Sequence, residues 1–289
     1  IGVAPQERLA ELERHPELVA TRDDLCVELS ALCNHADQPE RALQLLLERR
    51  FQPWEGGEGQ ALGQYVRTRL SLGRRALDAG QADGAVVQFS SALNPPASLG
   101  EARHLLANPS DILYWLGVAH AATGNQERAH AAWETAASFR GDFQLMSVRA
   151  YSELSYFSAK ALAALGRQDE AQTMFSAILA YAEAQHAEPA KIDYFATSLP
   201  TMLLFEDDLQ KRQMAGAGLI KAQALYGLGS IAAAGDALAE VLELDPNNAI
   251  AIDLAKELRA VPSVKDIIPN GEPLSARAAV GREREVVGG

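Results

Sequence analysis

One helical phrase recurs along the 289-residue chain, and this repetition constrains the fold more than any other feature. The clearest copy covers residues 110–141, SDILYWLGVAHAATGNQERAHAAWETAASFRG. It places Gly117 on a first helix and Ala129, Trp133 and Ala136 on a second, with the turn TGNQ between them. Small residues allow the two helices of a pair to cross closely, and the bulky ones fill the space to the next pair. The phrase therefore predicts a helix pair that stacks on similar pairs.

Four further segments fit the same frame. The anchor alanines of the five copies are Ala42, Ala85, Ala129, Ala171 and Ala234. Every interval between them exceeds the ~34 residues of an uninterrupted array. Each interval therefore carries an insertion, which in stacked helix pairs maps to a loop on one face. The turns of the copies place Gly or a polar residue after the first helix and acidic residues early in the second, where the helix dipole favours them.

This frame resembles the tetratricopeptide repeat, in which a W..LG..Y helix precedes an A...F..A helix and a proline. His120 stands where tyrosine is usual. The resemblance implies an all-α protein, a right-handed α-α superhelix (tetratricopeptide-like solenoid) with inserted loops. We expect residues 1–259 to form the helical repeat domain and the Pro/Gly-rich residues 260–289 to form a C-terminal tail. The register predicts four large residues buried between neighbouring pairs: Trp133, Phe89, Phe175 and Leu238.

Composition excludes several classes of function. The chain has 26 Lys+Arg against 38 Asp+Glu, and this net charge of -12 opposes binding to nucleic acid. No apolar window reaches the ~18 residues that a membrane-spanning helix needs. The sequence contains no zinc-binding, dinucleotide-binding or hydrolase motif, so we expect no cofactor and no metal. Cys26 and Cys33 would lie too far apart on one helix for a disulfide and are expected to be buried thiols. The absence of a signal peptide favours the cytoplasm, although a chain that starts at Ile1 reads as a fragment or processed product.

Two insertions have distinctive sequences. Residues 49–65, RRFQPWEGGEGQALGQY, place the aromatic residues Phe51 and Trp54 before a glycine-rich acidic turn. Residues 191–213 carry further aromatics, Pro200 and an acidic run that ends at Asp208 and that we expect to be a solvated helix start. These phrases, above all R-F-x-P-W-E-G-G-E-G, are similar to the C-terminal helical part of a family of large bacterial proteins. The N-terminal region of such proteins is carbohydrate-active-enzyme-like and of unknown function. The resemblance implies a catalytic or sugar-binding region upstream.

Glu55 and Glu58 are the candidate catalytic residues. Two neighbouring carboxylates can share acid and base work on a glycosidic bond. The alternative is that the glycines mark tight packing against a neighbouring domain and that both carboxylates accept hydrogen bonds from the backbone. We favour packing, because a lone solenoid rarely holds an active site. We then expect this turn to lie against the upstream region or against the insertion around Tyr194 and Phe195.

The inward register positions of the first helices define candidate binding residues. This set is mixed and aromatic, and it lacks the stacked Lys and Asn residues that clamp a peptide carboxylate. Together with the aromatic insertion, the predicted binding residues are Phe51, Trp54, Arg67, Arg74, Tyr114, Tyr156, Lys160 and Tyr226.

The repeat frame favours an interaction or scaffolding module without catalysis, the helical part of a larger bacterial carbohydrate-related protein. Its partners would be a protein or an upstream domain of the same polypeptide, with carbohydrate as a further candidate ligand. In the first alternative, Glu55 and Glu58 complete a glycoside-hydrolase-like active site together with the missing upstream domain. In the second, the chain is a free-standing peptide-binding adaptor.

Overall fold

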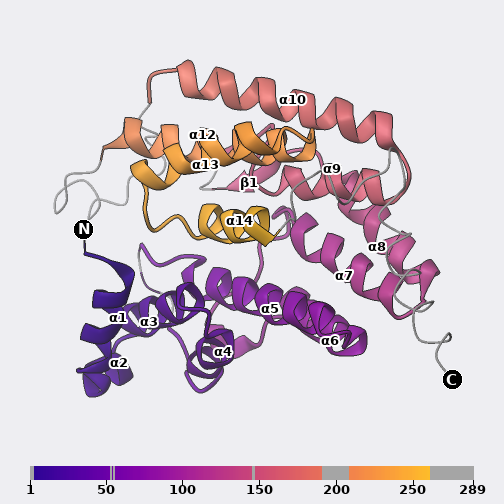
Figure 1. The fold of residues 1–289 in the computed structure, drawn as a ribbon. Coiled ribbons are helices and arrows are strands. Elements are labelled where there is room, and N and C mark those ends of the chain that lie inside the picture. The colour runs from indigo at the N-terminus through magenta and orange to yellow at the C-terminus, as the bar shows by residue number, and fades with distance from the viewer. Residues whose placement is uncertain (1–2, 53, 55, 145–146, 191–207, 261–289) are drawn as a thin grey trace, which may run out of the picture. The chain divides into compact units, whose positions relative to one another are not determined.

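The computed structural model describes residues 3–52, 54, 56–144, 147–190 and 208–260. The regular elements of this part are helices except for two short strands, which confirms the predicted all-α class (Figure 1). The chain divides into two compact units, a division that the repeat pattern did not predict. Of the described residues, unit 1 contains those up to Ala107 and unit 2 those from Asn108 onward.

Unit 1 consists of two antiparallel helix pairs that follow two short helices. Its core joins the first pair to Phe51 and to the first turns of the next helix. In chain order the elements are α1 (Pro5–Glu13), α2 (Pro16–Thr21), α3 (Asp23–His35), α4 (Pro39–Leu47), α5 (Gln60–Asp78), α6 (Ala82–Leu93) and the short 3-10 helix η1 (Ala97–Leu99). Cys26 and Cys33 are buried in α3 as unpaired thiols, as the sequence predicts.

In its described residues, unit 2 contains three further pairs and a last helix. Each first helix and each second helix packs on the first helix of the next pair, and one hydrophobic core runs through α7 to α12. The elements are α7 (Ser110–Ala122), α8 (Gln126–Ser138), β1 (Asp142–Gln144), β2 (Ser147–Arg149), α9 (Ser155–Ala164), α10 (Gln168–Ala187), α12 (Leu209–Gly227), α13 (Ile231–Leu244) and α14 (Ala249–Ala260).

The same turn joins the two helices of all five pairs. One residue of each turn adopts a positive φ of 64–81°, the left-handed conformation that ends a helix in the Schellman motif. The N–H of the residue that follows donates to a backbone carbonyl of the first helix. That of Asn125, for example, donates to the His120 carbonyl at 2.9 Å. Glycine adopts this conformation without steric cost, and Asp37 is the one described non-glycine residue that does so. The five residues are Asp37, Gly80, Gly124, Gly166 and Gly229.

Close contact between a glycine and a large ring sets how the helices of a pair cross. A Cβ added to Gly117 would lie 2.3 Å from Nε1 of Trp133, and one added to Gly73 would lie 2.3 Å from the Phe89 ring. Both contacts join the first and second helices of one pair, as the repeat frame predicts. The four large residues predicted to be core are all buried, with exposed fractions of 9% for Trp133, 0% for Phe89, 3% for Phe175 and 2% for Leu238.

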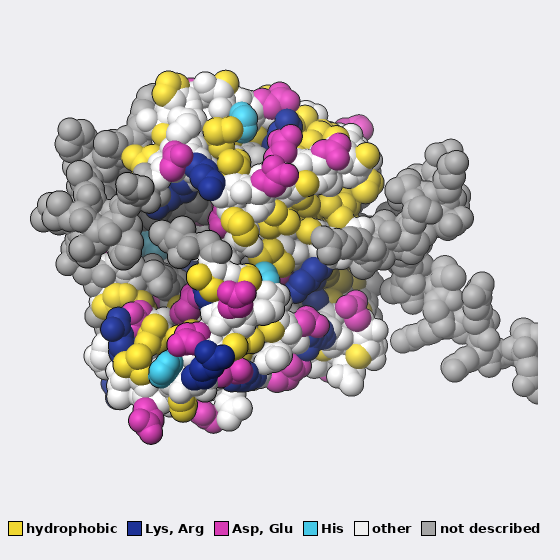
Figure 2. Space-filling model, turned by 60° about the vertical axis from the view of Figure 1, so that its left-hand side comes forward, with side chains coloured by type: hydrophobic (Ala, Val, Ile, Leu, Met, Phe, Trp, Pro, Cys, Tyr) yellow, Lys and Arg dark blue, Asp and Glu magenta, His cyan; other side chains and the backbone are white. Residues whose placement is uncertain are grey.

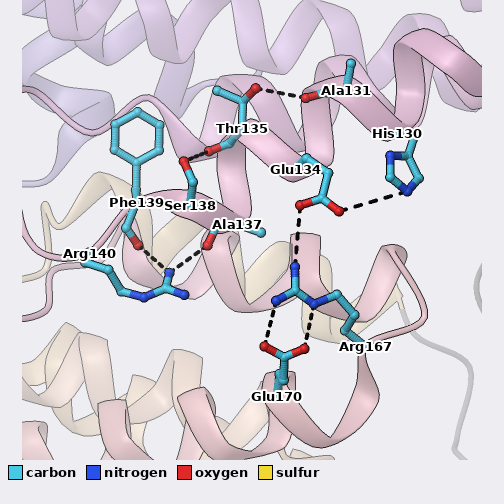
Figure 3. Close-up of polar contacts among 10 residues, drawn as sticks. All are labelled: His130, Ala131, Glu134, Thr135, Ala137, Ser138, Phe139, Arg140, Arg167 and Glu170. Atoms are coloured by element: carbon cyan, nitrogen blue, oxygen red, sulfur yellow. Dashed lines mark hydrogen bonds and ion pairs between the residues drawn. The ribbon is translucent and has the colours of Figure 1, made fainter.

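Polar contacts between second helices lie on the outside of unit 2 (Figure 3). Arg167 precedes α10 and donates to both carboxylate oxygens of Glu170 at 2.6 Å, and also to Glu134 of α8 at 3.4 Å. The guanidinium lowers the pKa of the Glu170 carboxyl below its ordinary value. Because these groups are exposed, water screens the pairs and they contribute little to stability.

A short antiparallel hairpin between α8 and α9 departs from the all-helical expectation. Asp142 faces Arg149 across β1 and β2, and Phe143 faces Val148. The hairpin is fixed to the start of α7, because the buried Asp142 accepts the N–H of Asn108 at 3.1 Å. Strands of three residues are too short to show the alternating pattern by which sequence reveals a strand.

The two other insertions are described only in part. Asp208 accepts the N–H of Lys211 at 2.9 Å and caps α12, so the acidic run ends in a helix start as predicted. Tyr194, Phe195 and the tail beyond Ala260 lie outside the described residues. We call the glycine-rich turn that follows Trp54 the Trp54 turn. Its predicted contact with the insertion around Tyr194 and Phe195 therefore stays a prediction.

Candidate functional site

The first helices of the three pairs in unit 2 form one continuous face. α7 packs on α9 and α9 on α12, and we call their shared inner surface the A-helix face. The structure brings four of the predicted binding residues together there. They are Tyr114 on α7, Tyr156 and Lys160 on α9, and Tyr226 on α12.

Lys160 is the centre of this face. Its Nζ lies 4.7 Å from the ring centroid of Tyr114, 5.3 Å from Trp115, 5.2 Å from Tyr156 and 5.9 Å from Phe157. An ammonium within about 6 Å of an aromatic ring face is attracted by the electrons of that ring. Only 16% of the Lys160 side chain is exposed, so aromatic rings replace most of its hydration. We call these five residues the Lys160 cluster.

A carboxylate from the last helix completes the surroundings of the ammonium. Glu257 of α14 places Oε1 3.7 Å from the Lys160 Nζ and is itself 22% exposed. Burial lowers the pKa of Lys160, but Tyr114, Tyr156 and Glu257 outweigh burial and raise that pKa above its ordinary value. Burial also raises the pKa of the Tyr156 hydroxyl. At neutral pH the cluster therefore holds a protonated Lys160 beside a neutral Tyr156.

Gln223 occupies on α12 the register position that Lys160 occupies on α9. Its side chain is 2% exposed, yet the Oε1 atom has no hydrogen-bond partner among the described residues. One turn further along α12, Tyr226 stacks on Tyr156 with ring centroids 6.4 Å apart and planes 23° apart. The A-helix face thus contains a slightly exposed cation, the buried rings of Tyr114 and Tyr156, and one buried acceptor without a partner among the described residues.

These groups suit binding better than chemistry. An ammonium held protonated cannot act as a base, and the tyrosine hydroxyl beside it stays neutral. Among the residues that the structure describes, no group of three or more His, Cys, Asp or Glu is arranged to hold a metal ion.

No helix in the same part of the chain is long and apolar enough to span a membrane. Within each unit, the described basic side chains seen in Figure 2 are interspersed with acidic ones.

The Trp54 turn in unit 1 is the second candidate region. The Trp54 ring lies directly on Gly57, where an added Cβ would lie 1.8 Å from the ring. Phe51 is only 2% exposed, and its N–H donates to the Ser98 carbonyl at 2.8 Å. Phe51 is therefore a core residue that anchors the turn, while Trp54 is partly exposed. Gly57 thus allows close packing within the turn, and the predicted packing against a neighbouring domain stays a prediction.

The catalytic role predicted for Glu55 and Glu58 stays a prediction. Glu58 is exposed, and Glu55 lies outside the described residues. A different carboxylate accepts the backbone hydrogen bonds expected at this turn. Glu101 accepts the N–H groups of Gly59 at 2.6 Å and Leu62 at 3.0 Å and so caps the start of α5. This capping role could not be predicted from the sequence, because Glu101 lies far from the turn along the chain.

Trp54 borders two depressions, of about 500 and about 170 Å³. The charged side chains around the larger one are in part paired with each other. Asp23 binds Arg49, and Arg22 binds Asp24. The remaining predicted binding residues of unit 1, Arg67 and Arg74, are half-buried on α5.

Four residues at this site were not among the predicted binding residues: Trp115, Phe157, Gln223 and Glu257. Trp115 and Phe157 immediately follow the predicted Tyr114 and Tyr156, and the repeat register places only one residue of each pair on the face. Glu257 lies on α14, which the repeat frame left out. Its helical signal was present, because Ala251, Leu254 and Leu258 follow the spacing of one helix face.

No family model matches the chain. Among solved structures, the chain is similar to the crystal structure of YrrB, described as "a TPR protein with an unusual peptide-binding site". The sequences are 15% identical, the TM-score is 0.31, and the match covers 85% of this chain and 97% of that chain.

Proposed function

We propose that this chain is a non-catalytic interaction module that binds a peptide segment of a partner protein on the A-helix face of unit 2. The observation that carries the proposal is the Lys160 cluster. A lysine ammonium with a 16% exposed side chain stands among four aromatic rings on a surface built from repeated helices.

The repeat itself does not require a cation at this position. The equivalent residue of α7 is Val118, so an apolar side chain fits the same register. Taking an ammonium out of water costs free energy that a packed apolar residue would avoid. A cation retained there is consistent with recognition of an acidic group, and the rings add apolar contact area.

The larger context is also part of the proposal. The R-F-x-P-W-E-G-G-E-G phrase supports the placement of this chain as the helical part of a larger bacterial carbohydrate-related protein. The half-exposed Trp54 beside two depressions is a suitable docking point for an upstream domain. In the full-length protein, Trp54→Ala is then expected to weaken association between the two parts, while Glu58→Gln leaves any glycosidase activity unchanged. A loss of turnover of about 10³-fold in Glu58→Gln with the association intact would instead support catalysis.

A peptide selection tests the proposal for the A-helix face. A display library of random 12-residue peptides is panned on the immobilised chain, and affinities of enriched peptides are measured by fluorescence anisotropy. Lys160→Gln is expected to weaken binding at least about tenfold, or ~1.4 kcal/mol. The matched control is Lys211→Gln, which removes an exposed lysine of α12 and is expected to leave affinity unchanged. Equal affinity in both variants, or a selection without enrichment, would contradict the proposal.

A further inference from the structure

The last helix among the described residues, α14, extends one acidic side chain to the centre of the A-helix face. α14 packs on α12 and α13, with Ala251 0% and Leu254 6% exposed in a core shared with Leu219 and Val241. From this position it extends Glu257 to within 3.7 Å of the Lys160 ammonium. The chain thus places one of its own amphipathic helices, with an acidic side chain, beside the cation of its proposed binding surface.

The fit of α14 is incomplete at two polar groups. The Lys160–Glu257 distance of 3.7 Å exceeds the ~2.7–3.2 Å range of an N–H···O hydrogen bond. The Oε1 atom of Gln223 is buried on the same face and has no partner among the described residues. A buried acceptor without a partner costs free energy that a better-matched ligand would recover. α14 therefore buries apolar surface but gives neither the Lys160 ammonium nor the Gln223 Oε1 atom a hydrogen bond of ordinary length.

We propose that α14 is an internal occupant of a site for an acidic amphipathic helix of a partner protein, which displaces it. The proposal rests on the function proposed above and specifies its ligand. The partner helix would bring a carboxylate to Lys160, an apolar side chain to the place of Leu254, and an amide N–H donor to Gln223. Asn or Gln suits the last role, because a cationic donor would be repelled by Lys160.

The connection to α14 makes such an exchange feasible. α13 ends at Leu244 and α14 begins at Ala249, so only residues 245–248 tether the helix. Asn248 caps α14 by accepting the Ala251 N–H at 3.0 Å, and this bond stays within the segment when α14 leaves. A short tether gives the internal helix an effective concentration of the order of millimolar, which a partner must overcome. Weaker internal docking should therefore strengthen binding from outside.

The test uses the full chain and a labelled peptide of residues 249–260, AIAIDLAKELRA, as probe. Glu257→Lys places a second cation beside Lys160 and is expected to detach α14. Hydrogen exchange should then show lost protection over residues 249–260, and the probe should bind at least about tenfold more tightly than to the parent chain. Glu257→Gln removes the attraction without repulsion and is expected to give a smaller gain of about threefold, corresponding to ~0.65 kcal/mol.

Controls separate this inference from general effects. Lys256→Glu reverses an exposed charge on α14 and should change neither protection nor probe affinity. A probe with Gln in place of Glu257 should bind about threefold more weakly, and Lys160→Gln should abolish the gain. Unchanged probe affinity in both Glu257 variants, or equal binding of both probes, would overturn the inference. So would concentration-dependent dimerisation of the parent chain through α14, because the occupant would then be a second copy. Selected peptides that still require Lys160 would leave the proposed function standing in either case.

Discussion

The two units use the same helix pair but place their aromatic residues differently. In unit 1 the aromatic pair Phe51 and Trp54 lies in an insertion between pairs, anchored to the Ser98 backbone. In unit 2, Tyr114 and Tyr156 occupy the repeat register itself and surround Lys160. A stacked helix pair can thus acquire a recognition surface through an inserted loop or through its first helices. The first route leaves the repeat unchanged, and the second buries a charge within it.

The largest expected effect tests whether both units share one packing rule. Trp133→Ala in unit 2 and Phe89→Ala in unit 1 each remove a large buried ring and should lower the free energy of unfolding by ~3–5 kcal/mol. Urea titrations followed by circular dichroism measure both changes. Val148→Ala is the control, because that side chain is 78% exposed and its loss should cost under ~0.5 kcal/mol. A loss in free energy of unfolding below about 1 kcal/mol for either variant would show that the two units do not share one packing register.

Glycine substitutions test the same rule from the opposite side. Gly117→Ala and Gly73→Ala each push a methyl group into a ring and should destabilise the chain by ~1–3 kcal/mol. Gly63→Ala lies in α5 with nothing within 4 Å of the new methyl group. There the helix should gain ~0.4–1 kcal/mol, because alanine loses less backbone entropy on folding. Destabilisation by all three alanines would show that the close crossing of the paired helices does not explain the effect of Gly117→Ala and Gly73→Ala.

Helix capping tests how the insertion of unit 1 is held. Glu101→Ala removes the acceptor of two backbone N–H groups at the start of α5 and should cost ~0.5–2 kcal/mol. Glu58→Ala removes an exposed carboxylate of the same turn and should cost under ~0.5 kcal/mol. Thermal unfolding of both variants measures the difference. A larger loss of stability in Glu58→Ala than in Glu101→Ala would show that Glu58 is the carboxylate that stabilises the turn.

The smallest expected effect is a difference in alkaline stability between the units. Burial raises the pKa of the Cys26 and Cys33 thiols above the reference value of 9.0. The fold therefore favours the neutral thiols, and their contribution is complete below pH 9 and declines as the pH rises above it. In unit 2 the raised pKa of Tyr156 gives the same sign, from a reference value of 10.0. Hydrogen exchange at pH 8 to 10 should show unit 1 losing protection first, and Cys26→Ala with Cys33→Ala should remove that difference.

The sequence predicted what local spacing determines. Repeated apolar positions gave the helix pairs, and glycine or a polar residue after each first helix gave turns such as the one at Gly124. Contacts between distant segments were not predictable in this way. Glu101 caps a helix whose start lies some forty residues earlier, and Glu257 reaches Lys160 from a helix outside the repeat frame. Short strands such as Asp142–Gln144 give no periodic signal and depend on the buried Asp142 contact.

Hydrogen exchange of the full chain, with and without a peptide selected on it, tests the central claim most directly. The claim is that recognition occurs on the A-helix face of unit 2 and not at the Trp54 turn of unit 1. Bound peptide should increase protection in residues 110–122, 155–164 and 209–227 and leave residues 49–65 unchanged. Protection confined to residues 49–65, with the three helices of unit 2 unaffected, would contradict the account.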